Sequence, residues 1–424
     1  MSSQSDIQSS QSAVSDLDHL LQRYQAKQAK GLSLDMTRGK PGPEQLDLSL
    51  KMLSLVTEED FHSESGTDCR NYGGLDGLPE SKRFFGEFLG ASPSEVLIGD
   101  NTSLGLMHDT MINAMFHGVV GGSASWGSQS PKFICPAPGY DRHFNICKHF
   151  GIEMITVDNG PDGPDMEQVE KLAAADASIK GIWIVPRYGN PTGAVCSDEV
   201  VDRLARMKTQ ADDFRIMWDN AYAVHHLVDN PRPLKNLLDA CKVAGNPDRV
   251  FMFGSTSKIT FAGAGLAAMA ASEANIDWMR KHKFNQTIGP DKLNQLRHVR
   301  FFKHGMADVE AHMKKHAAIL KPKFDAVDAI LEAELGGKGI AEWSKPEGGY
   351  FISLNIADGC AKRVVELAGQ AGVKLTPAGA SFPYRTDPRD RNIRIAPSLP
   401  SLEAIKEATE VLAICVQVAV NEKA

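Results

Sequence analysis

The sequence predicts an α/β protein in which helices cover both faces of a mostly parallel sheet, together with a smaller α+β domain. Two observations predict this. Short, nearly continuous apolar runs alternate with helical segments from about residue 94 onwards. After about residue 275 this alternation gives way to long helices mixed with a few strands. Strands that are apolar along their whole length are typical of a parallel sheet, because both of its faces are buried.

A helix with leucines at helical spacing is expected from Ser15 to about Lys30. Apolar runs bounded by turn-forming residues predict the strands of the large sheet, at 95–100, 132–138, 152–159, 180–186, 214–220, 249–255 and 263–272. Helices are expected between them, at 103–118, 141–151, 166–176 and 197–207. Such alternation indicates parallel strands joined by helical crossovers.

The smaller domain is expected to begin with one long helix over 305–334, which Pro322 should bend. Its other elements are strands at 348–355 and 392–397 and helices at 362–372 and 402–420. A chain of 424 residues is too long for a single ordinary core. The expected divisions are a flexible tail at 1–14, an N-terminal segment at 15–70 that packs with the small domain, a large domain at 71–300 and a small domain at 301–424.

The composition excludes several classes of function. The net charge of −7, from 46 basic and 53 acidic residues, argues against nucleic acid and anionic membranes as partners. The seven cysteines include no CxxC pair, so no metal site is expected. The N-terminus is polar and no apolar run is long enough for a membrane span, so we expect a cytoplasmic protein.

Four polar features fall on the proposed strands or at their ends, where open α/β sheets bind ligands. They are Asn190 in a turn, Asp219 with Tyr222, Lys258 beside Ser255 and Ser257, and Arg394 in an alternating apolar strand. A buried carboxylate needs a partner, a lysine among small hydroxyl residues can act as a Schiff-base amine, and an arginine can bind a carboxylate with its planar fork. Each feature alone would equally suit a turn, a helix cap, a solvated cation or an exposed edge position.

In this order and spacing, the four features resemble the fold-type-I pyridoxal-phosphate-dependent aminotransferases, from about Gly31 to the end of the chain. The segments Asn71–Gly77, Asp100–Ser103 and Pro138–Tyr140 agree with the motifs of that family. The segments TRGKPGP and GSTSKITFAGAG are most similar to those of a divergent bacterial aspartate aminotransferase subgroup, often labelled MocR-like. The resemblance implies a mostly parallel seven-stranded sheet between helices, plus a smaller α+β domain.

The resemblance also implies roles at the cofactor, pyridoxal 5′-phosphate. Lys258 would hold it covalently and move the proton at the substrate Cα, and Asp219 would keep its pyridine nitrogen protonated. Tyr222 and Asn190 would hydrogen-bond the ring oxygen O3′, and Tyr140 would stack on the ring. The phosphate would be bound by Asn101, Thr102, Ser103, Ser255 and Ser257.

For the substrate, the resemblance implies that Arg394 binds the α-carboxylate, with Gly39 at the entrance and Asn190 beside it. Tyr72 would reach the phosphate of the other subunit, which implies a homodimer with active sites at the subunit interface. One departure stands out: the family usually has a phosphate-binding arginine eight positions after the lysine, where this chain has Leu266. The phosphate would then be held without that arginine.

The implied activity is transamination between aspartate or glutamate and 2-oxoglutarate or oxaloacetate, by a ping-pong Schiff-base mechanism. The cation for a second substrate carboxylate stays open among Arg38, Lys40, Lys283, Arg297 and Arg300. A lyase or decarboxylase on the same fold is the alternative enzyme. A non-catalytic effector-binding module is disfavoured, because only about 35 residues precede the match and they contain no basic recognition helix.

Overall fold

The computed structural model describes residues 17–423, which divide into two compact units. The small unit comprises Met1–Lys40, Leu320–Lys345 and Tyr350–Ala424, and the large unit comprises Pro41–Ile319 and Pro346–Gly349. The expected tail at 1–14 lies outside the described residues.

The division differs from the expected boundaries. Residues 41–70 and 301–319 belong to the large unit rather than to the small one. Helix α11 (Met306–Leu335) runs without interruption through the point of division, with Pro322 inside it. A division within one helix changes neither the composition nor the periodicity of the sequence. The hydrophobic pattern therefore could not predict where the two units divide.

The large unit is built on an eight-stranded sheet with the order β2-β9-β8-β7-β6-β3-β4-β5. Its strands are β2 (Val96–Ile98), β3 (Lys132–Ala137), β4 (Glu153–Gly160), β5 (Gly163–Pro164), β6 (Ile179–Ile184), β7 (Arg215–Asp219), β8 (Val250–Ser255) and β9 (Ala267–Ala271). Pairing is parallel from β4 through β3, β6 and β7 to β8, whereas β9 is antiparallel to both β8 and β2. The mostly parallel α/β prediction is confirmed. The count of seven omitted β5, a two-residue partner of β4 that is too short for a hydrophobic pattern.

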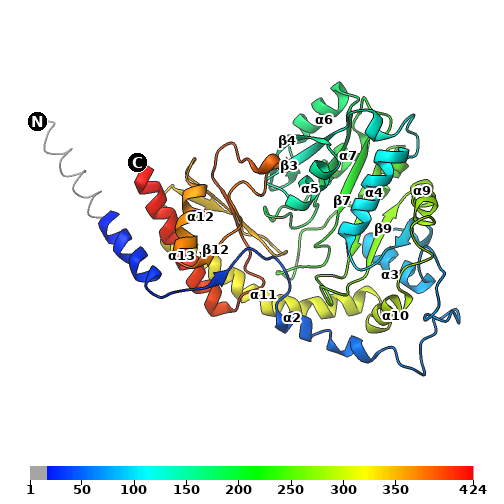
Figure 1. The fold of residues 1–424 in the computed structure, drawn as a ribbon, viewed down its shortest axis with the longest axis horizontal. Helices are drawn as coiled ribbons and strands as arrows, with labels where there is room; N and C mark the ends of the chain where they lie inside the picture. Colours follow the sequence, from blue (N-terminus) through cyan, green and yellow to red (C-terminus); the bar gives the residue numbers. More distant parts are fainter. Residues whose placement is uncertain (1–16, 424) are drawn as a thin grey trace, which may run out of the picture. The chain divides into compact units, whose positions relative to one another are not determined.

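Helices pack on both sides of this sheet (Figure 1). They are α3 (Pro79–Leu89), α4 (Ser103–His117), α5 (Asp141–His149), α6 (Met166–Ala175), α7 (Asp198–Arg206), α8 (Leu237–Val243), α9 (Glu273–Lys283) and α10 (Lys292–Phe301). Alternate residues of β7 enter two separate cores: Ile216 and Trp218 pack in one, and Met217 packs in the other. This is the two-residue period of a strand that is covered on both faces.

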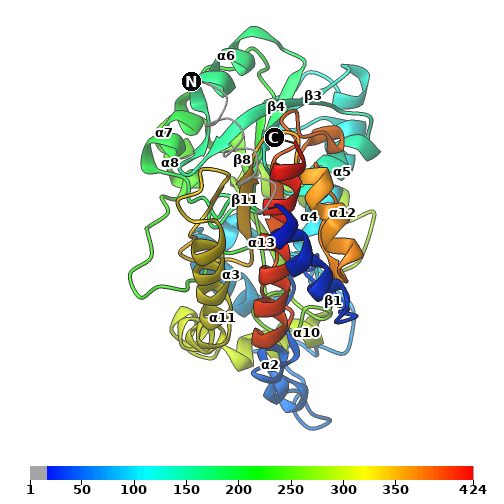
Figure 2. The ribbon, with the colours of Figure 1, turned by 90° about the vertical axis from the view of Figure 1, so that its left-hand side faces the viewer.

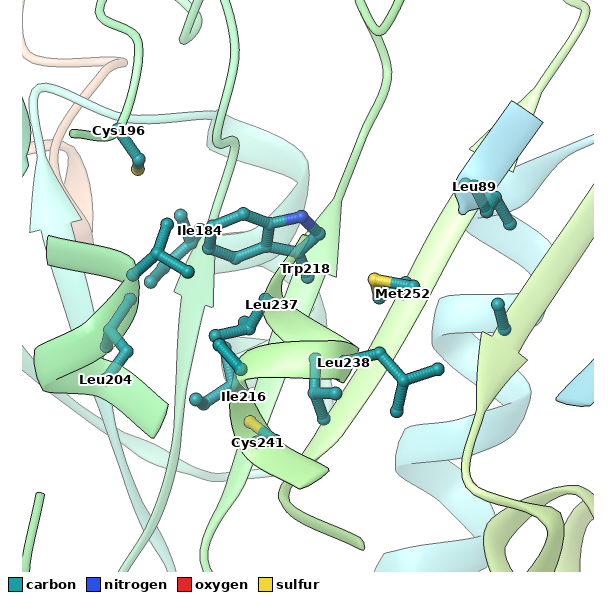
Figure 3. Packing of buried hydrophobic residues seen from close by; sticks show 14 of the residues in the cluster. Leu89, Ile184, Cys196, Leu204, Ile216, Trp218, Leu237, Leu238, Cys241 and Met252 are labelled. Atoms are coloured by element: carbon teal, nitrogen blue, oxygen red, sulfur yellow. The ribbon is translucent and has the colours of Figure 1, made fainter. Parts of the chain in front are cut away.

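The first of these cores joins the strands to helices α7 and α8 (Figure 3). Trp218 from β7 lies near Ile184 from β6, and Leu237, Leu238 and Cys241 from α8 are stacked beneath. Leu204 reaches the same core from α7. The core therefore fixes the relative positions of β6, β7 and β8, whose ends carry the predicted site residues.

The small unit contains an antiparallel sheet of β10 (Ala341–Trp343), β11 (Ile352–Ile356) and β13 (Asn392–Ile395), and a parallel pair of β1 (Leu34–Asp35) with β12 (Val373–Lys374). Helix α13 (Leu402–Lys423) lies beside α12 (Ala361–Gln370) and beside the helix at 17–28 (Figure 2). Nζ of Lys27 pairs with Glu407 over 2.8 Å, which ties the N-terminal helix to α13. Within residues 17–423, no helix has the length and apolar character needed to cross a membrane.

The packing predicts how stability depends on α8. Leu238 is fully buried there, whereas Val243 on the same helix is 91% exposed. Leu238→Ala is expected to lower the free energy of unfolding by about 2–5 kcal/mol, because the truncation leaves a cavity. Val243→Ala, the matched control, should change it by less than about 0.5 kcal/mol. Urea unfolding followed by tryptophan fluorescence measures both, and equal effects would contradict the packing.

Candidate active site

Three neighbouring parallel strands end at one edge of the large sheet, and each is followed by predicted site residues. Asp219 is the last residue of β7, and Ser255 is the last residue of β8. Asn190 follows β6 in the loop, and Lys258 follows β8 in a short turn. Because β6, β7 and β8 are adjacent and parallel, their carboxyl ends bring these residues to one edge.

The carboxylate of Asp219 is buried with only half of its hydrogen-bonding capacity used. The residue is 1% exposed. Oδ2 accepts a hydrogen bond from Nε2 of His143 over 3.0 Å, whereas Oδ1 is buried without a hydrogen-bond partner. An ionised carboxylate only accepts hydrogen bonds, so Nε2 of His143 carries the proton. The unpartnered oxygen marks a place for a donor from a bound molecule.

His143 was not among the predicted site residues. It lies on α5 with its ring stacked on Trp183, at 4.4 Å between centroids and 13° between planes. The edge of the Tyr140 ring meets His143 at a centroid distance of 4.9 Å. The only signal in the sequence was a histidine three residues after Tyr140, on the buried face of the following helix. Its partner Asp219 is far away in the chain, so no local motif connects the two.

The amine of Lys258 lies 4.8 Å from the ring centroid of Tyr222, which is itself buried. Desolvation lowers the pKa of Lys258, and the negative charge of Asp219 opposes this by raising it, with a net lowering. The structure therefore brings together Lys258, Asp219 and Tyr222, the three predicted catalytic residues. Asn190, also buried, lines a cavity together with Tyr140 and His143.

The predicted phosphate-binding residues lie around the N-terminus of α4. Ser103 is its first residue, and Thr102 caps it by accepting a hydrogen bond from the Leu104 N–H over 3.2 Å. Oγ of Ser257 donates to the carbonyl of Asn101 over 3.1 Å, which joins this helix start to the turn that carries Lys258. A helix N-terminus with free N–H groups favours an anion.

Leu266 is 1% exposed, and its N–H donates to Oγ1 of Thr256 over 2.8 Å. The side chain that stands where the resemblance expects an arginine is therefore apolar and enclosed. A cavity of about 310 Å³ lies beside it, lined also by Asn101 and Arg297. Nε of Arg297 is buried without a hydrogen-bond partner.

The two predicted substrate residues of the small unit lie around one aromatic ring. Arg394 on β13 has its guanidinium 5.0 Å from the ring centroid of Phe351, and its Nη2 donates to Oγ1 of Thr376 over 3.3 Å. A Cβ added to Gly39 would lie 2.0 Å from Cζ of Phe351, so only glycine fits there. In the large unit, Tyr72 is 80% exposed on a loop.

Comparison with known proteins accounts for this arrangement. The sequence profile of the family described as aspartate amino-transferase matches residues 9–424. The chain belongs to the aspartate aminotransferase family. It is 45% identical to an aspartate aminotransferase of Corynebacterium glutamicum over 96% of this chain and 94% of that one. It is 51% identical to a protein of Mycolicibacterium smegmatis that is provisionally named an aminotransferase, over 95% of each chain.

Solved structures agree. A crystal structure of an aspartate transaminase from Corynebacterium glutamicum superposes with a TM-score of 0.95 at 44% identity, covering 97% of each chain. The α-aminoadipate aminotransferase LysN of Thermus thermophilus shares the fold at a TM-score of 0.74 and 21% identity, covering 95% of this chain and 97% of that one. This aminotransferase is therefore a pyridoxal-phosphate-dependent transaminase of fold type I, as the sequence predicted.

The residues of this aminotransferase fit the cofactor. The buried, unpartnered Oδ1 of Asp219 suits a protonated ring nitrogen, and the desolvated amine of Lys258 suits attachment to a carbonyl carbon. The N-terminus of α4, with Thr102 and Ser103, suits a phosphate. When bound, pyridoxal phosphate supplies an electron sink for the electrons released at the substrate Cα.

His143 gives the first test of the site. His143→Phe keeps a ring against Trp183 but removes the hydrogen bond to Oδ2 of Asp219. Losing a hydrogen bond to a charged group costs about 1.5–3 kcal/mol, so kcat/KM should fall by roughly 10- to 150-fold. His143→Gln, which can still donate, should recover part of this loss. Steady-state kinetics at saturating cofactor measure both variants, and equal values for His143→Phe and the wild type would show that this bond is not needed.

Proposed function

We propose that this aminotransferase moves an amino group between aspartate or glutamate and 2-oxoglutarate or oxaloacetate. The observation that carries the proposal is the half-satisfied carboxylate of Asp219 beside the desolvated amine of Lys258. The choice of substrate is supported by the relative from Corynebacterium glutamicum, which is named an aspartate aminotransferase and shares 45% identity along nearly the whole chain.

In this proposal, Lys258 is the base and acid of the reaction. Its lowered pKa provides a neutral amine closer to neutral pH than a solvated lysine would. The amine would take the proton from the substrate Cα and deliver it to the cofactor carbon that receives the amino group. Asp219 holds a proton on the ring nitrogen of the cofactor, and His143 fixes the orientation of the carboxylate. Tyr222 and Asn190 hydrogen-bond the ring oxygen, and Tyr140 stacks on the ring.

The phosphate is held by Ser255, Ser257 and the residues at the N-terminus of α4, Asn101, Thr102 and Ser103. Hydroxyl and backbone N–H donors then replace the arginine that is absent at Leu266. For the substrate, Arg394 binds the α-carboxylate through its planar fork, beside Gly39. Its placement on the Phe351 ring and against Thr376 supports a fixed orientation of the guanidinium.

For the second carboxylate, we favour Arg297 among the candidate cations. Arg300 is already paired with Asp60 over 2.6 Å, and Nζ of Lys283 donates to the carbonyl of Ile98 over 2.5 Å. Arg297 donates from Nη2 to Oδ1 of Asn294 over 2.9 Å, but its Nε is buried without a partner and the residue lines an open cavity. An unsatisfied guanidinium N–H is the group that a carboxylate would complete.

We also propose that the aminotransferase is a homodimer and that Tyr72 serves the site of the partner subunit. Apolar side chains that are exposed in one copy support this: Leu50, Leu53, Tyr72, Ile288 and Leu293. Two of these segments touch, because Nζ of Lys292, next to Leu293, donates over 2.8 Å to the carbonyl of Gly73, next to Tyr72. Exposed apolar surface of this kind is typical of a subunit interface. A cytoplasmic location is supported by the seven cysteines, which are all buried free thiols.

The activity is tested by mixing the enzyme with aspartate and 2-oxoglutarate and measuring oxaloacetate. Lys258→Ala is expected to lower kcat by about 10²–10⁴-fold or more, because the general base is lost. Lys281→Ala, an exposed lysine on α9, is the control and should retain the wild-type rate. Borohydride reduction followed by peptide mapping should place the cofactor on Lys258. Release of pyruvate or ammonia from a single amino acid, without an acceptor, would instead favour the lyase.

The role of Tyr72 is tested with hybrid dimers. Tyr72→Ala is expected to weaken cofactor binding, so that the variant is mostly inactive at limiting cofactor. Mixing it with Lys258→Ala should restore about one quarter of the wild-type activity per subunit, because half of the dimers are hybrids and each hybrid has one intact site. No recovery on mixing would show that Tyr72 acts within its own subunit, and full activity of Tyr72→Ala alone would show that it has no role.

A further inference from the structure

The lysine of the proposed reaction is carried by a short turn, residues 256–260, rather than by a helix or strand. The turn is closed by hydrogen bonds from the N–H groups of Ile259 and Thr260 to the carbonyl of Thr256, each 2.8 Å long. A single turn leaves its last carbonyl groups without helical partners, so other donors must satisfy them. Buried histidines contact this turn at three points.

Two of the histidines bind carbonyl groups of the turn. Nε2 of His225 lies 3.2 Å from the carbonyl oxygen of Lys258, and Nε2 of His312 lies 2.8 Å from that of Ile259. A carbonyl oxygen only accepts, so both nitrogens carry a proton and donate. His225 comes from the loop after β7, whereas His312 comes from α11. The turn is therefore fixed by two elements that are distant in the sequence.

The third histidine binds a hydroxyl of the turn. Nδ1 of His298 donates to the carbonyl of Asn294 over 2.8 Å, so in the neutral ring its Nε2 must accept. Nε2 lies 2.9 Å from Oγ1 of Thr256, which therefore donates its proton to the ring. The same Oγ1 accepts from the N–H of Leu266 over 2.8 Å. This directional chain joins α10, the turn and the end of the following loop.

All three rings are buried: His225 is 3% exposed, His298 0% and His312 6%. Desolvation lowers the pKa of each, to about 4 for His298, so the rings are neutral at physiological pH. A fourth ring, His316, lies beside His312. Nε2 of Gln45 donates to its Nδ1 over 3.0 Å, so its Nε2 carries a proton and faces the same carbonyl of Ile259.

We propose that His225, His298 and His312 are positioning residues that hold the turn 256–260 and thereby fix the amine of Lys258 against the reacting atoms. This histidine clamp rests on the proposed role of Lys258. Each ring makes its contact through a hydrogen bond whose direction is set by a neutral tautomer. Small displacements of a catalytic group lower rates strongly, so a lysine on a short turn needs such external support.

The clamp is tested with the holoenzyme of His312→Leu, which removes the donor, and of His312→Gln, which can still donate. Trp126→Phe is the matched control: it loses a buried hydrogen bond, 3.0 Å from Nε1 to Asp213, in the same unit but away from the turn. The first measurement is hydrogen–deuterium exchange of the peptide containing residues 256–260, made with and without cofactor. The second is the pH midpoint of the absorbance of the bound cofactor. The third is steady-state kinetics, which give kcat and KM separately.

In His312→Leu, we expect the backbone amides of the turn to exchange about tenfold faster and the absorbance midpoint to shift. We also expect kcat to fall about tenfold with little change in KM. His312→Gln should return all three towards wild type. Trp126→Phe should lower Tm only. If His312→Leu changes Tm alone, as the control does, the clamp is refuted.

Should His312→Leu not fold, His225→Leu and His225→Gln supply the same comparison at the carbonyl of Lys258. Peptide mapping after borohydride reduction of the wild type separates the two proposals. A label on a residue other than Lys258 would refute the proposed role of the lysine. A label on Lys258 together with unaltered exchange in the histidine variants would refute only the clamp.

Discussion

The large unit is organised around a buried charge that the protein itself satisfies only in part. Burying a carboxylate is costly unless hydrogen bonds replace its water, and Asp219 accepts a hydrogen bond at only one of its two oxygens, from His143. In the proposed holoenzyme, the ring nitrogen of the cofactor would complete the remaining oxygen. The parallel strands β6, β7 and β8 make this geometry possible, since their packed core fixes the edge from which Asp219 projects.

The same charge sets the state of Lys258. Desolvation favours the neutral amine and Asp219 favours the protonated one, and the desolvation dominates. The enzyme thus balances two opposing effects rather than relying on a strong base. Such a balance depends on position, because the attraction between the two groups changes with their separation. A shift of the turn would change both the pKa of Lys258 and the position of its amine. Fixed contacts at the turn would therefore keep both constant.

The central sheet could be predicted because each buried strand is a continuous apolar run. Asp219 and Lys258 could be named as candidates because Asp219 ends such a run and Lys258 lies three residues after another. Strand β5 and the division inside α11 left no comparable pattern. The histidines were missed for a different reason. His143, His225, His298 and His312 lie on separate elements, and each is an ordinary buried residue in its own segment. Only the tertiary structure brings them to Asp219 and to the turn.

Leu266 connects these observations. Its side chain is enclosed in the core, and its N–H completes the chain from His298 through Thr256. A guanidinium at this position would have to be buried beside a loop in which a Cβ on Gly265 would already lie 2.7 Å from Oγ of Ser257. Neutral hydrogen bonds hold this loop. Uncharged groups therefore hold the turn that carries Lys258, and an enclosed leucine stands where the resemblance expects an arginine.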